Sequence, residues 1–141
     1  MPVYALKNND DFKGISVQVD IYIDPKDVPE YLEIFKPFLN LIIQEAELTY
    51  FEVFQEADFQ PEQPDFPGDR GHLRFIECFS RDTDWFLNTL RLKPYIKEYE
   101  EATDKYWVKP RTWLIYDRLG SELTHWNPGD DKTSRRGRSR L

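Results

Sequence analysis

The chain has 141 residues, of which 40% are hydrophobic and 16% aromatic, so it can bury one sizeable core but is too short for two ordinary domains. Its net charge of −7 is uneven, because residues 121–141 carry five basic and three acidic side chains, which leaves −9 on the first 120 residues. A body this acidic repels phosphate backbones and anionic lipids, so we expect the folded part to bind neither nucleic acid nor membranes.

The sequence contains no apolar run of membrane-spanning length and no secretory signal, so we expect an intracellular protein. Cys78 is the only cysteine, which excludes an intrachain disulfide and a cysteine-based zinc site. We interpret it as a free buried thiol.

Residues 15–23 read ISVQVDIYI, in which apolar and polar side chains alternate as in a half-buried strand. A helix is predicted next, because Asp27 and Glu30 have the spacing of a capping box and Pro29 falls in the first turn. Its apolar positions follow the i, i+3, i+4, i+7 rule. They are Val28, Tyr31, Leu32, Phe35, Phe38, Leu39 and Ile42.

Residues 48–54 and 72–80 read LTYFEVF and HLRFIECFS, which predict a second and a third strand. The proline-rich, acidic residues 55–70 between them are interpreted as a surface loop and a candidate lid. Asp82 is expected to cap a short helix and Pro94 to begin another. Residues 111–119, RTWLIYDRL, predict a fourth strand.

This order predicts an α+β domain of the ferredoxin-like βαββαβ type, with a four-stranded antiparallel sheet and both helical segments on one face. We place the domain at residues 15–119, after an arm of residues 1–14 and before a flexible basic tail of residues 120–141. The later strands carry large apolar side chains on both faces, for example Tyr50 against Phe51 and Trp113 against Leu114, so one of these sets would lie on the uncovered face. The sheet is therefore expected to stack on that of a second copy in a homodimer.

Glu77 shares a predicted strand face with Phe75 and Phe79, where desolvation would raise its pKa into a range useful for acid or base catalysis. The alternative is a structural carboxylate paired with Arg74 or Arg111. Both interpretations stay open at this point.

A planar ligand could be held near the second helical segment, where Trp85, Asn88 and Tyr95 offer a flat apolar wall, an amide and a phenol. Aromatic residues at helical spacing, Tyr99 among them, are more often core. The candidate catalytic residues are Glu77, Asn88 and Tyr95, and the candidate substrate-binding residues are Trp85, His72, Tyr99 and Phe75. His72 and His125 do not form a metal-binding pattern, and no phosphate loop or serine-hydrolase motif is present, so we expect no metal and no cofactor.

Four segments carry a family resemblance: EAELTYFEVF at 45–54, HLRFIECF at 72–79, DWFLN at 84–88 and KPYIKEY at 93–99. Over about residues 15–119 the chain resembles the antibiotic biosynthesis monooxygenase (ABM) family, particularly its fungal members. The resemblance implies a dimeric α+β barrel, and several members oxygenate polyphenolic substrates with O₂ and without metal or flavin. Glu77 matches a glutamate of the third strand, and Asn88 stands near where many relatives have a histidine.

The resemblance implies a cofactor-independent, monooxygenase-like tailoring enzyme of secondary metabolism that acts on an aromatic or polyketide-like small molecule. In this hypothesis Trp85 and Tyr95 sandwich the substrate, while Asn88 and Glu77 bind or deprotonate its phenol or enol. The alternatives are a non-oxidative cyclase, isomerase or dehydratase on the same fold, and a non-catalytic dimeric binding protein for small molecules.

The final tripeptide, Ser139-Arg140-Leu141, is a variant of the S-K-L peroxisomal signal and follows further arginines in the predicted tail. We therefore expect a peroxisomal protein, with the cytoplasm as the alternative.

Overall fold

Residues 14–125 are described in the computed structural model of the chain. A compact unit spans Gly14–Arg118, and residues 119–125 are grouped apart from it, with one short turn at Ser121–Leu123. Most of the predicted arm (1–14) and tail (120–141), with the tripeptide at 139–141, lies outside the described residues. No helix within residues 14–125 is long and apolar enough to cross a membrane.

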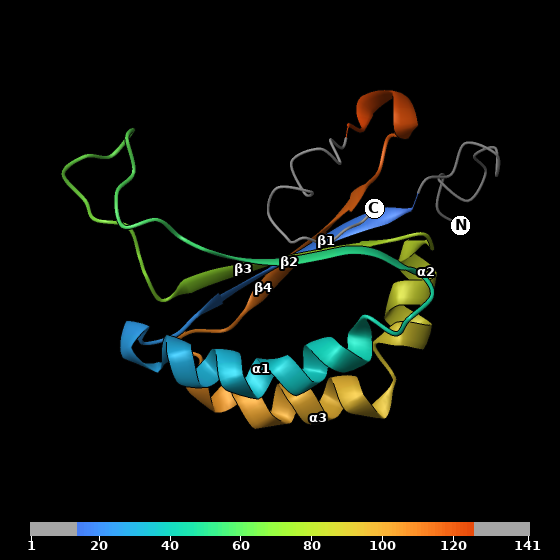
Figure 1. The fold of residues 1–141 in the computed structure, drawn as a ribbon, viewed down its shortest axis with the longest axis horizontal. Helices are drawn as coiled ribbons and strands as arrows, with labels where there is room; N and C mark the ends of the chain where they lie inside the picture. The colour runs from blue at the N-terminus through green and yellow to red at the C-terminus, as the bar shows by residue number, and fades with distance from the viewer. Residues whose placement is uncertain (1–13, 126–141) are drawn as a thin grey trace, which may run out of the picture. The chain divides into compact units, whose positions relative to one another are not determined.

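The compact unit is built on one four-stranded sheet, whose strands confirm the predicted ones. They are β1 (Ile15–Tyr22), β2 (Leu48–Gln55), β3 (His72–Phe79) and β4 (Thr112–Asp117). Their order across the sheet is β2-β3-β1-β4, and every neighbouring pair is antiparallel (Figure 1). This arrangement confirms the predicted ferredoxin-like α+β fold.

The helices lie on one side of the sheet. Figure 1 shows α1 (Val28–Ile42) and α3 (Pro94–Thr103) next to each other below the strands. Between β3 and α3 come the short α2 (Thr83–Trp85) and a π-helical turn at Phe86–Leu90. Asp82 caps α2 as predicted, because its side chain accepts a hydrogen bond from the backbone N–H of Trp85 at 2.9 Å.

The predicted capping box of α1 is wrong, although the helix begins where expected. A 3-10 turn, Pro25–Asp27, leads into α1, so Asp27 already has a helical backbone and its side chain makes no capping hydrogen bond. The capping side chain is Asp24, which accepts a hydrogen bond from the backbone N–H of Lys26 at 3.0 Å. The first turn of the helical segment is therefore stabilised three residues earlier than the sequence pattern indicates.

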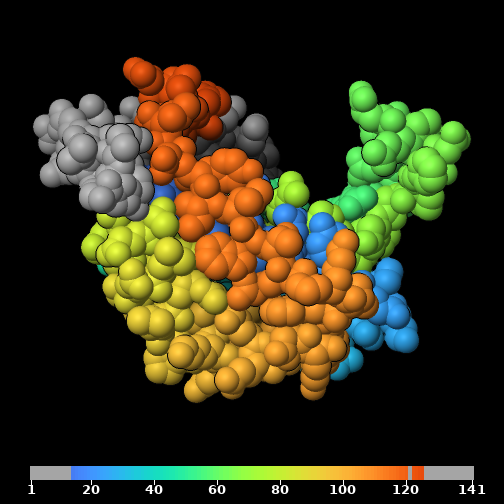
Figure 2. Space-filling model, turned by 180° about the vertical axis from the view of Figure 1, so that it is seen from behind, coloured from blue at the N-terminus to red at the C-terminus, as the bar shows by residue number. Residues whose placement is uncertain are grey.

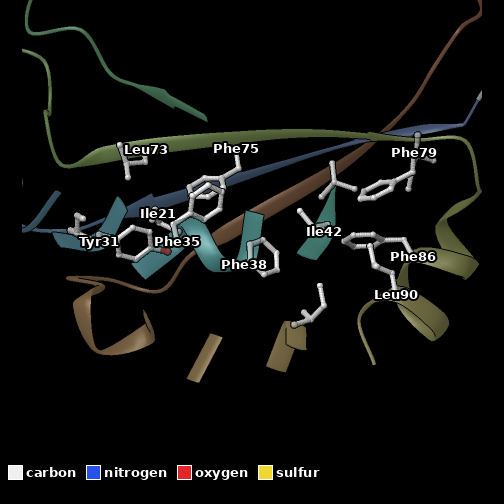
Figure 3. Close-up of a cluster of buried hydrophobic side chains, with 14 of the residues drawn as sticks. Ile21, Tyr31, Phe35, Phe38, Ile42, Leu73, Phe75, Phe79, Phe86 and Leu90 are labelled. Carbon is white, nitrogen blue, oxygen red and sulfur yellow. The ribbon is translucent and has the colours of Figure 1, made fainter. Parts of the chain in front are cut away.

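The core fills the space between α1 and the helix-facing side of the sheet. Figure 3 shows Phe35 of α1 close to Phe75 of β3, and Phe79 close to Phe86 of the π-helical turn. The ring centroids lie 5.1 Å apart for Phe35 and Phe75 and 5.7 Å apart for Phe79 and Phe86. These aromatic contacts fix α1 and the π-helical turn against the central strand β3.

The opposite face of the sheet is apolar, as expected, and its exposed large side chains are Tyr50, Phe54, Leu114 and Tyr116. Cys78 lies on this outer face too. Its thiol is free, but the prediction that it is buried is wrong, because an outer-face position leaves it half-exposed.

The loop of residues 56–71 contains no helix or strand and leaves Phe59 and Phe66 exposed. It lines a groove on the outer face through Glu56 and Gln60, whereas none of its residues line the cavity beneath the sheet. The loop therefore does not cover that cavity.

Candidate active site

A partly open cavity of about 60 Å³ lies between the helix-facing side of the sheet and the helices. Apolar side chains form most of its wall, including Val19 of β1, Phe75 of β3 and Phe86 of the π-helical turn. The polar and charged lining residues are Tyr31, Glu77, Arg91, Tyr99, Glu100 and Arg111. A few fixed polar groups in an apolar wall are typical of small-molecule sites.

Glu77 is the buried acid of this wall. It lies on β3 opposite Val17 of β1 and Phe51 of β2, and only 9% of its surface is exposed. Within residues 14–125 its carboxyl makes no hydrogen bond or ion pair. Burial raises the pKa of Glu77 to about 8, and Arg91 and Arg111 only partly oppose this effect. Close to neutral pH the group can therefore exchange a proton, as an acid or base catalyst must.

Two arginines of the wall converge on one carboxylate. Arg91 Nη1 donates to Glu100 Oε2 at 2.5 Å, and Arg111 Nη2 donates to the same oxygen at 2.9 Å. The predicted alternative partners of Glu77 are thus engaged elsewhere. Arg111 bonds Glu100, and Arg74 lies on the outer face, where its Nε donates to Asp20 at 2.8 Å.

Aromatic rings hold both arginines in place. The guanidinium groups of Arg91 and Arg111 lie 5.5 Å and 5.9 Å from the ring centroid of Trp113, and Arg111 also lies 5.6 Å from that of Trp107. Figure 2 shows the side of the molecule on which β4, which carries Trp113, lies above α3, which carries Glu100. The arginine-containing side of the cavity is therefore formed by residues in or next to α3 and β4.

A pair of phenols lines another part of the cavity. The hydroxyl oxygens of Tyr31 and Tyr99 lie 2.6 Å apart, and burial raises the pKa of both groups. The indole Nε1 of Trp107 is buried nearby. It has no hydrogen-bond partner within the described residues, although it lies near enough to the Tyr31 hydroxyl to oppose part of the rise in the pKa of that phenol. A substrate oxygen placed there could accept a hydrogen bond from this N–H.

Three of the residues singled out in the sequence come together in the cavity wall: Glu77, Phe75 and Tyr99. Tyr95 does not line it. Its hydroxyl donates to Glu45 at 2.6 Å, and the same carboxylate binds Lys93 Nζ at 2.7 Å and 2.9 Å. Burial and Glu45 raise the pKa of Tyr95. This cluster ties the end of α1 to the start of α3.

Asn88, Trp85 and His72 lie outside the cavity wall. Asn88 is exposed on the π-helical turn, where its Nδ2 donates to Asp84 at 2.8 Å. Trp85 is buried in the core, with its ring centroid 5.4 Å from that of Phe79.

His72 lies on the outer face of the sheet. Its Nε2 contacts Asp20 at 2.5 Å, its Nδ1 contacts Glu56 at 2.8 Å, and its ring stacks on Tyr22.

Arg91, Glu100 and Trp113 line the cavity but were not among the site residues predicted from the sequence. One signal was available: within the predicted fourth strand, Arg111 and Trp113 are two residues apart and so belong on one face. Within residues 14–125, no group of three or more His, Cys, Asp or Glu side chains is placed to hold a metal ion.

The fold and this cavity define a small α+β protein with an enzyme-like site, in which a buried carboxyl faces aromatic walls and fixed arginines. No family model matches the sequence. The chain is 27% identical over 106 residues to a protein of the fungus Pestalotiopsis microspora that is named as a presumed monooxygenase. That match spans 75% of this chain and 80% of the fungal protein.

Solved structures of antibiotic biosynthesis monooxygenases have a similar fold. An antibiotic biosynthesis monooxygenase matches with a TM-score of 0.57 and 15% identity, over 75% of this chain and 99% of that protein. SnoaB from Streptomyces nogalater, a cofactor-independent oxygenase solved in a mutant form, matches with a TM-score of 0.58 and 10% identity, over 79% of this chain and 99% of SnoaB. The chain has the fold of the antibiotic biosynthesis monooxygenases, which confirms the resemblance found in the sequence. The fungal relative is thus named as a monooxygenase and SnoaB as an oxygenase.

Proposed function

We propose that the chain is a cofactor-independent, monooxygenase-like tailoring enzyme of secondary metabolism that acts on an aromatic or polyketide-like small molecule. The observation that carries the proposal is the Glu77 carboxyl, which is buried, lacks an ion pair within residues 14–125 and lines an aromatic cavity. A structural carboxylate in such a place would be paired, because an unpaired buried charge is costly. Glu77 instead keeps a proton that it can exchange.

The proposed chemistry starts with proton removal. The Glu77 carboxylate takes a proton from a phenol or from an enolisable CH₂ group, and the resulting anion is electron-rich enough to react with O₂. For a CH₂ group, one oxygen atom becomes the product carbonyl and the other leaves as water with both hydrogens. The substrate supplies all four electrons that reduce O₂, so the reaction needs no other reductant.

Substrate entry requires the cavity to widen. Its volume of about 60 Å³ holds a few water molecules, whereas pockets for drug-sized ligands reach roughly 300 Å³ or more. The wall formed by Arg91, Glu100 and Arg111 is partly exposed and is held by side-chain contacts. We assign Phe75 and Tyr99 contacts with the substrate.

Four of the predicted site residues have no role in substrate binding in this proposal. Asn88, Tyr95, Trp85 and His72 line no part of the cavity, so we assign them no contact with the substrate in the chain as described.

The test is oxygen uptake by the full chain with anthrone, a planar probe whose central CH₂ is enolisable. The expected result is one O₂ consumed per ketone formed, with a loss of about 100-fold or more in Glu77→Gln. Glu98→Gln is the matched control, because Glu98 is an exposed glutamate of α3, and its activity should stay within twofold of wild type, about the scatter of an exposed substitution.

Other outcomes of a wider panel of phenols and enolisable ketones point to the alternatives. Turnover without oxygen uptake indicates a non-oxidative cyclase, isomerase or dehydratase. Binding without turnover by any probe indicates a non-catalytic binding protein.

We also propose that the chain forms a homodimer through the outer face of its sheet. The exposed Tyr50, Phe54, Leu114 and Tyr116 support this, since an apolar patch on a sheet face is typical of a protein interface.

A further inference from the structure

Arg111 is held in the cavity wall more rigidly than an ion pair alone requires. Its guanidinium lies 5.6 Å from the ring centroid of Trp107 and 5.9 Å from that of Trp113. Only 18% of its side chain is exposed. An arginine fixed by two indoles loses little conformational freedom when it binds a ligand.

Most of the hydrogen-bonding capacity of Arg111 is unused. A guanidinium carries five N–H donors, but within residues 14–125 Arg111 makes one hydrogen bond, from Nη2 to Glu100 at 2.9 Å. Arg91 already gives the same carboxylate two contacts, at 2.5 Å and 3.4 Å. Glu100 is therefore satisfied without Arg111, and the other donors of Arg111 remain available to a ligand.

The charges of the wall point to the kind of ligand. Arg91 and Arg111 contribute two positive charges and Glu100 one negative charge, so this ion-paired cluster has one positive charge in excess. A monoanion neutralises this charge, whereas a phosphate dianion would leave the cluster with a net negative charge.

We infer that the substrate of this cavity carries a carboxylate, which Arg111 binds through the donors that Glu100 leaves free. The inference rests on the proposed function and narrows it to a small planar aromatic acid. The planar guanidinium suits this class, because it can bind both oxygens of one carboxylate while it stays beside the indoles. Glu100 acts as a positioning residue for both arginines.

The test compares benzoate with benzamide, which have nearly the same shape but differ in charge. Binding to the full chain is measured by titration calorimetry, with the fluorescence of the cavity tryptophans as a second signal. Wild type should bind benzoate at least about tenfold more tightly than benzamide, because charge-assisted hydrogen bonds are stronger than neutral ones. Equal binding of the two probes by wild type overturns the inference, and this measurement needs no variant that folds.

Variants of Arg111 test whether this residue is the source of the preference for benzoate over benzamide. Arg111→Gln should lower benzoate affinity about tenfold and leave benzamide affinity within about twofold, and Arg111→Lys should keep only part of the preference. Arg81→Gln is the matched control, because Arg81 also stacks on a tryptophan, Trp85, outside the cavity, and it should leave both affinities unchanged. A benzoate preference that survives in a folded Arg111→Gln variant overturns the inference.

The result can be separated from that of the oxygen assay. Glu77-dependent oxidation of anthrone without any benzoate preference overturns the carboxylate inference and leaves the proposed function intact. An Arg111-dependent benzoate preference without oxygen uptake supports the carboxylate site and contradicts the oxygenase.

Discussion

Glu77 of β3 lies directly opposite Val17 of β1 in the antiparallel sheet. The same row continues with Phe51 of β2 on one side and Ile115 of β4 on the other, so the carboxyl is the one acid in a row of apolar side chains. This surrounding disfavours the charged form and raises the pKa of Glu77 to about 8. The stability and the activity of the protein should both depend on this proton.

Stability should fall as the pH rises through the range in which Glu77 is protonated only in the folded state. The unfolded chain releases the proton near pH 4.5, whereas the folded chain holds it up to about pH 8. Between these values the folded state binds more protons, so Glu77 lowers the free energy of unfolding by up to about 1.4 kcal/mol per pH unit. Its stabilising contribution is complete below pH 4.5 and is lost at about pH 8.

Urea unfolding at a series of pH values checks this prediction. The difference in unfolding free energy between Glu77→Gln and wild type should increase steadily from pH 4.5 to about 8 and then stay constant. The difference cancels the titration of all other groups. A difference that does not change with pH would show that Glu77 is not buried as described.

The rate of the proposed reaction should rise with pH. Only the carboxylate form of Glu77 can accept a proton, so kcat/KM should increase about tenfold per pH unit at low pH and level off above about pH 8. Oxygen uptake measured across this range gives the profile. Glu77→Gln should leave a low rate without this inflection, and a rate that instead falls as the pH approaches 8 would mean that the protonated acid is the active form.

Simple periodicities predict most of this fold. Alternation placed Ile15 and Val17 on one face of β1, and the helical pattern identified Phe35 and Phe38 as core residues of α1. The same alternation singled out Glu77 as an acid on an apolar face. These features depend on neighbours in the sequence, which is why the sequence is sufficient for them.

The part of the site after β3 could not be predicted in this way. A π-helical turn replaces regular helix at Phe86–Leu90, and a new helix begins at Pro94, so one helical period does not hold from Trp85 to Tyr95. Asn88 is exposed as a result. His72 directly precedes Leu73 in β3, so alternation assigns it to the outer face, and its choice as a pocket residue went against that pattern.

The arginine wall depends on tertiary structure. Arg91 and Glu100 belong to different helical segments, and Arg111 precedes the edge strand β4. Only the packing of α3 beside that strand brings the three side chains together, and neither the helical nor the strand period contains that information.

The buried phenol pair should contribute measurably to stability. Tyr99→Phe removes the hydrogen bond to Tyr31 and leaves the Tyr31 hydroxyl buried without it, which should cost about 1–3 kcal/mol. Tyr31→Phe should have a similar effect. The double variant should lose less than the sum of the two single variants, because the second change leaves no further partner unsatisfied. Chemical denaturation of all four proteins gives the coupling, and strictly additive losses would contradict the pair.

The proposed dimer can be tested on the outer face of the sheet. Leu114 of β4 is 59% exposed, and a glutamate there would place a charge in the apolar interface. Wild type should sediment as a dimer at micromolar concentration, and Leu114→Glu should shift it towards single chains. Leu92→Glu is the matched control, since Leu92 is also 59% exposed but lies in the turn before α3. Circular dichroism checks that each variant keeps its fold, which should change little because neither side chain is buried in the single chain. Wild type that sediments only as single chains would exclude the interface.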